Sequence, residues 1–103
     1  MNPGRNIMII DDEVDLCLLM KNYLIHKHFV VHYALTLKEG MDMIEAVKPD
    51  ILFLDNNLPD GIGWKKAREI LDHYPKISLY LMMCLQKKFV LYKNLFHFLT
   101  WNF

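Results

Sequence analysis

Three acidic residues stand where two apolar runs end, and their types and spacing suggest chemistry with a metal ion. Asp11 and Asp12 directly follow the run NIMII, and Asp55 closes the run ILFLD. If these runs are neighbouring parallel strands, their carboxyl ends bring three carboxylates into one crevice, where open α/β sheets bind ligands. Carboxylates that repel one another need a counter-charge, and the hard cation Mg²⁺ suits oxygen ligands best.

A carboxylate beside such a cation can itself act as a nucleophile toward phosphorus. The metal ion neutralises the phosphoryl group in transfer, and an Asp then forms an aspartyl phosphate. The alternative is purely structural, because Asp at the end of a strand often starts a turn or caps a helix. An Asp pair after one apolar run, together with Asp followed by Pro and Gly after another, is more specific than any of these residues alone.

The periodicity of apolar residues predicts alternating strands and helices that would position these acids. The predicted strands cover residues 6–10, 29–35, 50–55 and 77–83, and the predicted helices cover residues 14–27, 37–47 and 64–74. Thr36 and Glu39 match a capping box at the start of the second helix. Connections of helix length and the absence of hairpin signals predict a parallel sheet with helices on both faces. Right-handed crossovers follow from that arrangement.

The C-terminal part of the chain differs in composition from the rest. Residues 85–103 hold six of the thirteen aromatic residues, and no Asp or Glu follows Asp72. The spacing of apolar residues favours a helix over about residues 86–95 followed by an extended segment. The run FHFLTWNF is equally compatible with a strand, because periodicity alone does not resolve short apolar runs.

Length and composition bound the class of protein. A chain of 103 residues is predicted to form a single domain. Twelve Lys and Arg balance twelve Asp and Glu, so no global field attracts nucleic acid or an anionic membrane. The N-terminus carries no secretory signal, and the longest apolar stretch is too short to span a bilayer. Cys17 and Cys84 lack metal-type spacing and are interpreted as small buried side chains, so we expect a cytoplasmic protein in a reducing compartment.

The acidic residues and their surroundings together resemble the receiver domain of two-component response regulators. The segment IIDDE corresponds to the acidic pair of that family, and LFLDNNLPDGIG corresponds to its phosphoacceptor segment, with Pro59 and Gly63 shaping the loop. Within a single domain of residues 1–103, the resemblance covers residues 6–82 and leaves residues 83–103 atypical. It implies a flavodoxin-like, doubly wound parallel sheet in three α/β/α layers. The implied strand order is 2-1-3-4, with the fifth strand incomplete or replaced.

The resemblance also implies a role for each site residue. Asp55 would be the phosphoacceptor, and it would hold Mg²⁺ directly together with Asp12. Asp11 would act through water, and the main-chain carbonyl of Asn57 would be the third protein ligand. The donor would be a phosphohistidine on a sensor histidine kinase or a phosphotransfer protein in phosphorelay signal transduction. No enzyme activity is implied beyond the protein's own phosphorylation and dephosphorylation.

The C-terminal part departs from the family pattern. The Ser or Thr that ends the fourth strand in receivers aligns with Met83, which Met82 and Cys84 flank. The Lys that ends the fifth strand would fall just beyond Phe103. These departures leave open a degenerate receiver that acts as a phosphorylation-independent interaction or dimerisation module, and they predict a homodimer through residues 84–103. An Asp-nucleophile phosphatase ranks last, because an Asp-x-Asp pattern at the nucleophile is missing.

Overall fold

A computed structural model describes residues 5–85 and 88–93 of the chain. Five strands form one sheet in the order β2-β1-β3-β6-β7, and two short strands, β4 and β5, form a small antiparallel pair. The strands are β1 (Asn6–Ile10), β2 (Val30–Ala34), β3 (Ile51–Asp55), β4 (Asn57–Leu58), β5 (Gly61–Ile62), β6 (Ser78–Leu85) and β7 (Lys88–Lys93), and the helices are α1 (Val14–Ile25), α2 (Leu37–Val47) and α3 (Gly63–His73). The predicted order 2-1-3-4 is confirmed, because β2, β1, β3 and β6 are parallel neighbours.

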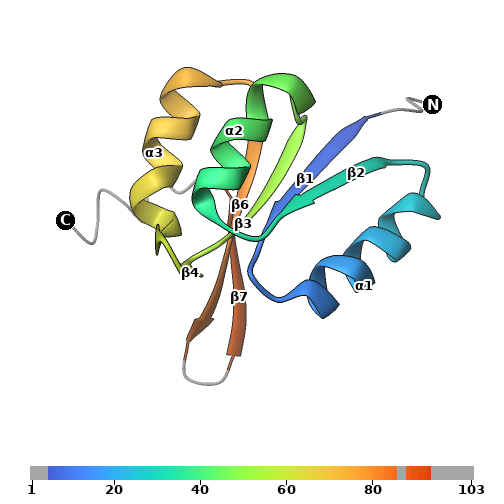
Figure 1. Cartoon of the computed structure of the whole chain (residues 1–103), viewed down its shortest axis with the longest axis horizontal. Helices are drawn as coiled ribbons and strands as arrows, with labels where there is room; N and C mark the ends of the chain where they lie inside the picture. The colour runs from blue at the N-terminus through green and yellow to red at the C-terminus, as the bar shows by residue number, and fades with distance from the viewer. Residues whose placement is uncertain (1–4, 86–87, 94–103) are drawn as a thin grey trace.

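Helices cover both faces of the sheet and create two apolar cores, one on each face. Figure 1 shows α2 and α3 together on one side of the sheet and α1 on the other. Ile44 of α2 and Ile70 of α3 belong to the core on one face, whereas Cys17 of α1 belongs to the core on the other. Burying each such aliphatic side chain stabilises the fold by roughly 1.5–3 kcal/mol. The central strands are apolar without alternation because both of their faces are buried.

The predicted cap of the second helix is present at the start of α2. The Glu39 backbone N–H donates to Thr36 Oγ1 at 3.1 Å, as the capping box requires. The Glu39 carboxylate accepts from the backbone N–H of Leu35 at 2.7 Å, one residue before the cap residue. Two orphan donors near the helix start are thereby satisfied, which fixes the point where α2 begins.

A second acid, Asp60 in the turn between β4 and β5, also holds the start of α2. Its two carboxylate oxygens accept from the backbone N–H groups of Leu37 at 2.8 Å and Lys38 at 2.9 Å. These two hydrogen bonds lower the pKa of Asp60 below its ordinary value. The loop that follows Asp55 is therefore tied to α2, a contact that sequence reasoning did not foresee.

The helix predicted over residues 86–95 is wrong where the structure describes that segment. Lys88–Lys93 form β7, which pairs antiparallel with β6 from Tyr80↔Lys93 to Leu85↔Lys88. The prediction of no hairpin is wrong at the same place. The segment KFVLYK is rich in residues that favour strands, and the open edge of β6 offers backbone partners that a helix would leave unused. Residues 86–87 and 94–103, where the rest of this prediction falls, lie outside the described residues, and dimerisation through residues 84–103 stays a prediction.

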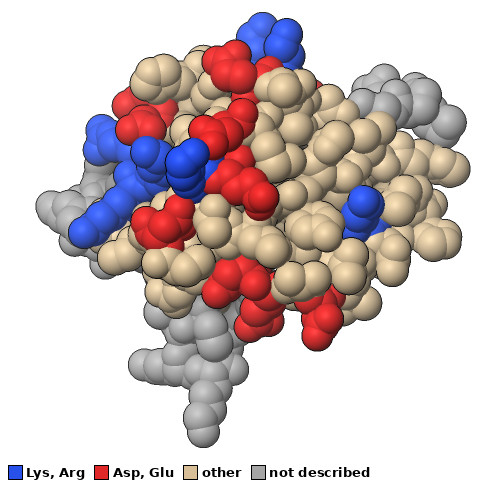
Figure 2. Space-filling model, viewed as in Figure 1, with Lys and Arg blue, Asp and Glu red and all other residues tan. Residues whose placement is uncertain are grey.

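Basic and acidic side chains are interspersed over much of the face shown in Figure 2, and ion pairs such as Lys66–Glu69 join some of them. Figure 2 shows Lys and Arg gathered over α3 and a group of acidic side chains at the lower edge, where α1 begins in Figure 1. α3 contributes Lys65, Lys66 and Arg68 to the basic region. Within residues 5–85 and 88–93, no helix is long and apolar enough to cross a membrane.

Candidate metal-binding site

Three carboxylates converge at the carboxyl ends of β1 and β3. One oxygen from each of Asp11, Asp12 and Asp55 lies within 4.8 Å of the other two. Their meeting follows from the sheet, because β1 and β3 pair in parallel with Ile10 opposite Leu54. Asp11 is buried with 4% of its surface exposed, Asp55 is half-buried and Asp12 is exposed. The predicted convergence of acids from two strands is confirmed.

Backbone hydrogen bonds hold the two less exposed carboxylates in place. The Glu13 backbone N–H donates to Asp11 Oδ1 at 2.8 Å, at the start of α1. The Asn57 backbone N–H donates to Asp55 Oδ1 at 3.3 Å, a long bond within the loop after β3. Each carboxylate is thus oriented by a backbone N–H two residues after it, so each acidic motif contains the donor that holds its own Asp side chain.

The cluster is electrostatically unfavourable when all three groups are ionised. Burial away from water is the main cause that raises the pKa of Asp55 to about 6, and the charge of Asp11 adds to it. Burial likewise raises the pKa of Asp11, with Asp12 and Glu13 contributing further. A cation between the carboxylates would remove this repulsion, and an oxygen-only donor set fits a hard divalent ion such as Mg²⁺.

A cavity of about 300 Å³ opens beside the carboxylates. Its walls combine acidic groups with apolar side chains from α1 and β6: Asp11, Glu13, Leu16, Asp55, Asn57, Met82 and Met83. The space can admit a hydrated cation and a small anionic group next to Asp55. Leu16 joins the wall through the fold, and nothing in its sequence position marks it as a site residue. Glu13 ends the segment IIDDE and Met82 precedes Met83, so the sequence already places these two residues near the site.

Two methionines of β6 lie near the position at which receivers carry a hydroxyl. The sequence alignment puts Met83 at that position, and its neighbour Met82 lies directly opposite Asp55 in the pairing of β3 with β6. Both methionines are buried, with 1% and 9% of their surfaces exposed, and both line the cavity. A thioether donates no hydrogen bond. An anionic group at Asp55 therefore meets apolar walls on the β6 side.

Cys17 lies under the acidic cluster as a packing residue. It is fully buried, and its Sγ donates to the main-chain oxygen of Asp11 at 3.3 Å. Burial, reinforced by the charges of Asp11, Asp12 and Asp55, raises the pKa of the thiol to about 11. A thiol that stays protonated is neither a metal ligand nor a reactive nucleophile, so the interpretation of Cys17 as a small buried side chain holds.

The apo protein is expected to lose stability as the pH rises through the carboxylate titration. The folded state keeps a proton on Asp55 up to about pH 6, whereas the unfolded chain loses it near the ordinary value of 3.8. Stability contributed by this proton is therefore complete below pH 4 and lost by about pH 7. We expect a loss of about 1–2 kcal/mol after allowing for solvent screening at a half-buried group. Urea unfolding at pH 4 and pH 7.5 in EDTA measures it.

The control for this pH effect is the same pair of measurements with Mg²⁺ and with Asp55→Asn. Each change removes the repulsion, one with a cation and the other with a neutral amide. The difference between wild type and Asp55→Asn isolates the site from other carboxylates, such as Asp60, whose lowered pKa acts in the opposite direction. Identical pH profiles for the two proteins in EDTA would contradict the expectation.

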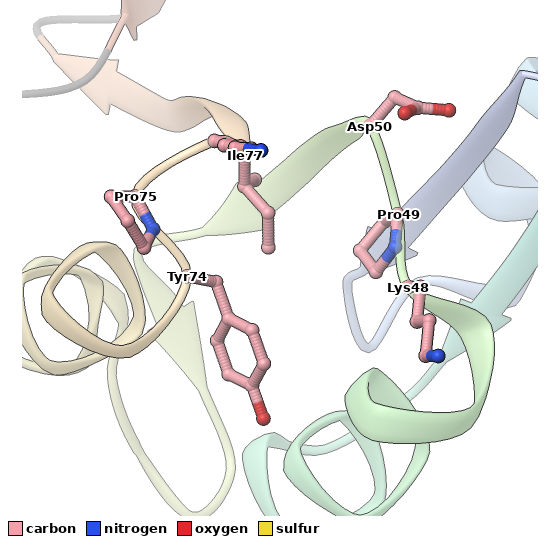
Figure 3. Close-up of a pocket in the computed structure, with 7 residues that line it drawn as sticks. Lys48, Pro49, Asp50, Tyr74, Pro75 and Ile77 are labelled. Carbon is pink, nitrogen blue, oxygen red and sulfur yellow. The ribbon is translucent and has the colours of Figure 1, made fainter.

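A second cavity lies at the amino ends of β3 and β6, at the opposite end of these strands from the acidic cluster. The residues that line it form no comparable group of carboxylates. It measures about 350 Å³ and is lined by Lys48, Pro49, Asp50, Tyr74, Pro75, Lys76 and Ile77. Figure 3 shows the Asp50 carboxylate pointing away from the Tyr74 ring. That carboxylate accepts from the backbone N–H of Asn6 at 2.8 Å, and the Tyr74 hydroxyl donates to Glu45 at 2.7 Å. Both polar groups have structural partners, so the acidic cluster remains the better candidate for chemistry.

Comparison with known proteins gives a consistent result for the sequence. A family model described as the response regulator receiver domain matches residues 7–95. The transcriptional regulatory protein DpiA of Escherichia coli (strain K12) is 35% identical over 78 residues, which cover 73% of this chain and 34% of DpiA. The regulatory protein VanR of Enterococcus faecium is 33% identical over 75 residues, which cover 71% of this chain and 32% of VanR. The chain thus spans about a third of the length of these curated relatives.

Solved structures give the same result for the fold. A two-component response regulator from Clostridium difficile superposes with a TM-score of 0.75 at 28% identity, over 81% of this chain and 68% of that one. The response regulator TrrA of Thermotoga maritima, solved in complex with Mg²⁺ and BeF, superposes with a TM-score of 0.68 over 73% of this chain and 65% of that one. At 23% identity, the second likeness shows the fold alone.

Proposed function

The chain belongs to the response regulator receiver domain family, and on that premise we propose that it accepts a phosphoryl group on Asp55 with the help of Mg²⁺. The observation that carries this proposal is the convergence of Asp11, Asp12 and Asp55 within 4.8 Å at the end of β3. A bound Mg²⁺ would neutralise charge on the phosphoryl group in transfer. Its protein ligands would be Asp12, Asp55 and the main-chain carbonyl of Asn57, with Asp11 acting through water.

The chain's own residues supply the nucleophile and its orientation. An Asp55 carboxylate oxygen attacks the phosphorus, and the bond from phosphorus to a histidine nitrogen of the donor breaks. The electron pair and a proton remain with the imidazole, so no further reactant is needed. Asp55 attacks only when ionised, and its pKa of about 6 keeps a substantial fraction ionised at neutral pH before any cation binds. The Asn57 N–H bond to Oδ1 fixes the carboxylate for attack.

The apolar wall at Met82 and Met83 should weaken the hold on the phosphoryl group. A hydroxyl at the end of β6 would donate a charge-assisted hydrogen bond to a phosphoryl oxygen, and the methionines cannot. Losing such a donor costs about 1.5–3 kcal/mol of phosphoryl stabilisation. We therefore propose slow phosphorylation and weak switching relative to receivers that keep the hydroxyl.

The donor that fits this chemistry is a phosphohistidine on a sensor histidine kinase or a phosphotransfer protein. Response regulators receive phosphoryl groups from such kinases, and the curated relatives include transcriptional regulators. This role places the protein in the cytoplasm, where kinase domains and free thiols such as Cys17 are found.

The proposal is tested by incubating the whole chain with acetyl phosphate and Mg²⁺ and recording the intact mass. We expect a mass increase of one phosphoryl group, reversed by hydroxylamine, which cleaves acyl phosphates. Replacing Mg²⁺ with EDTA is the control and should remove the increase. A chain that binds neither Mg²⁺ nor beryllofluoride and gains no mass would defeat the proposal.

A further inference from the structure

Asn56, the residue between the proposed nucleophile and the proposed carbonyl ligand, is fixed at three points. Its backbone N–H donates to the Met82 carbonyl at 3.0 Å, and its own carbonyl accepts from the Gly63 N–H at 2.8 Å. Its side-chain Oδ1 accepts from the Trp64 N–H at 3.1 Å. One residue thus joins β6 to the first two residues of α3.

The side-chain bond of Asn56 replaces a cap that α3 lacks. The N-cap residue of α3 is Ile62, which makes no side-chain capping bond. The first backbone N–H groups of a helix have no partner inside it, and polar side chains usually satisfy one of them. Asn56, eight residues before Trp64, supplies that acceptor from the loop. The start of α3 is therefore fastened to the residue next to Asp55.

Neighbouring contacts leave this segment little room to move. A methyl group on Gly63 would lie 2.3 Å from the Asp55 carbonyl oxygen and 3.0 Å from Asn56 Cα, so the start of α3 packs directly on the acceptor's backbone. On the far side of the loop, Asp60 binds the N–H groups that open α2. The loop is thus held at Asn56, directly after Asp55, and again at Asp60, and Asn57 lies between these two points.

We propose that Asn56 is a positioning residue that preorganises the cation site. Its side chain holds the backbone so that the Asp55 carboxylate and the Asn57 carbonyl face the same point before an ion arrives. The inference rests on the proposed function, because it takes those two groups as cation ligands. Repulsion among Asp11, Asp12 and Asp55 would otherwise drive the acceptor loop outward when the site is empty. Partners that orient metal ligands in this way typically change metal affinity 10–100-fold.

The test compares Mg²⁺ binding by the whole chain in wild type, Asn56→Ala and Asn22→Ala, measured by calorimetric titration. We expect Asn56→Ala to raise the Kd for Mg²⁺ about tenfold. Asn22→Ala should keep the wild-type Kd, because it removes the same side chain from an exposed position on α1 outside the site. Labelling by acetyl phosphate at saturating Mg²⁺ should reach the wild-type yield in both variants, which separates loss of affinity from loss of chemistry.

Asn56→Asp guards against a purely structural effect. It keeps an acceptor oxygen for the Trp64 N–H, and its added charge would tighten cation binding, so we expect a Kd no weaker than wild type. A lowered urea midpoint for Asn56→Ala with an unchanged Kd would overturn the inference, as would equal weakening in Asn22→Ala or weak binding by Asn56→Asp. A wild-type chain that does not bind Mg²⁺ would instead overturn the proposed function and the inference with it.

Discussion

Asp55→Asn is expected to abolish covalent phosphorylation, reducing the labelled fraction at least a hundredfold. An amide oxygen is a poor nucleophile toward phosphorus, and the replacement leaves no carboxylate at the end of β3. The substitution keeps the shape of the side chain and an oxygen that can still accept from the Asn57 N–H. Intact mass after incubation with acetyl phosphate and Mg²⁺ measures the loss.

The same variant should be more stable than wild type when no metal is present. The substitution removes the cost of burying an ionised carboxylate and the repulsion from Asp11, the two main causes that raise the pKa of Asp55, so we expect a gain of about 1–2 kcal/mol at pH 7.5. A variant that folds better and yet cannot be labelled separates the chemical role of Asp55 from any structural role. If the variant lost both labelling and stability, the two roles would not be separated. That result would contradict the expectation that the ionised Asp55 destabilises the metal-free fold.

Asp42→Asn is the matched control for Asp55→Asn. Asp42 is an exposed acid on α2 whose carboxylate lies 2.9 Å from Lys38 Nζ in an i,i+4 pair on the surface. Such pairs contribute little to stability, so its labelling and its unfolding should match wild type. Unchanged labelling in Asp55→Asn would show that another carboxylate, Asp11 or Asp12, is the acceptor.

The site was predictable because the patterns that define it, apolar runs that end in Asp and a capping box, each lie within a short stretch of sequence. Continuous apolar runs before Asp11 and Asp55 predict buried parallel strands, and such strands share one carboxyl edge. The capping box at Thr36 predicts where α2 begins, and the structure places the helix start there. Once those elements are placed, the geometry of the sheet brings the carboxylates together. No contact between residues distant in the sequence has to be known for this step.

The features that could not be predicted from the sequence depend on contacts between residues far apart in the chain. The Asn56 bond to Trp64 and the Asp60 bonds to α2 join a loop to two helices, and no periodic pattern records them. The pairing register that places Met82 opposite Asp55, beside the aligned position Met83, likewise depends on how β3 and β6 meet in the sheet. β7 forms where a helix was predicted, since an open strand edge outweighs a weak helical spacing.

Gly63→Ala is expected to destabilise the fold by about 2–3 kcal/mol and to weaken the cation site together with it. The added methyl group would meet the Asp55 carbonyl oxygen at 2.3 Å and Asn56 Cα at 3.0 Å, and both atoms belong to backbone that cannot rotate away. The start of α3 must therefore move, and the peptide that carries Asp55 moves with it. Urea unfolding and calorimetric titration with Mg²⁺ measure the two effects.

Gly40→Ala gives the comparison that identifies backbone as the cause. A methyl group on Gly40 would also be crowded, at 2.4 Å from Ile10 Cδ1 and 2.8 Å from Ile10 Cγ1, but both are side-chain atoms and not backbone. Ala gains about 1 kcal/mol over Gly within a helix, which offsets only part of the cost of displacing the fully buried Ile10 side chain. We therefore expect Gly40→Ala to lose some stability and to keep the wild-type Mg²⁺ affinity. If both variants lose stability equally and keep their affinity, crowding at α3 does not reach the acceptor, because a displaced Asp55 backbone must change the Kd.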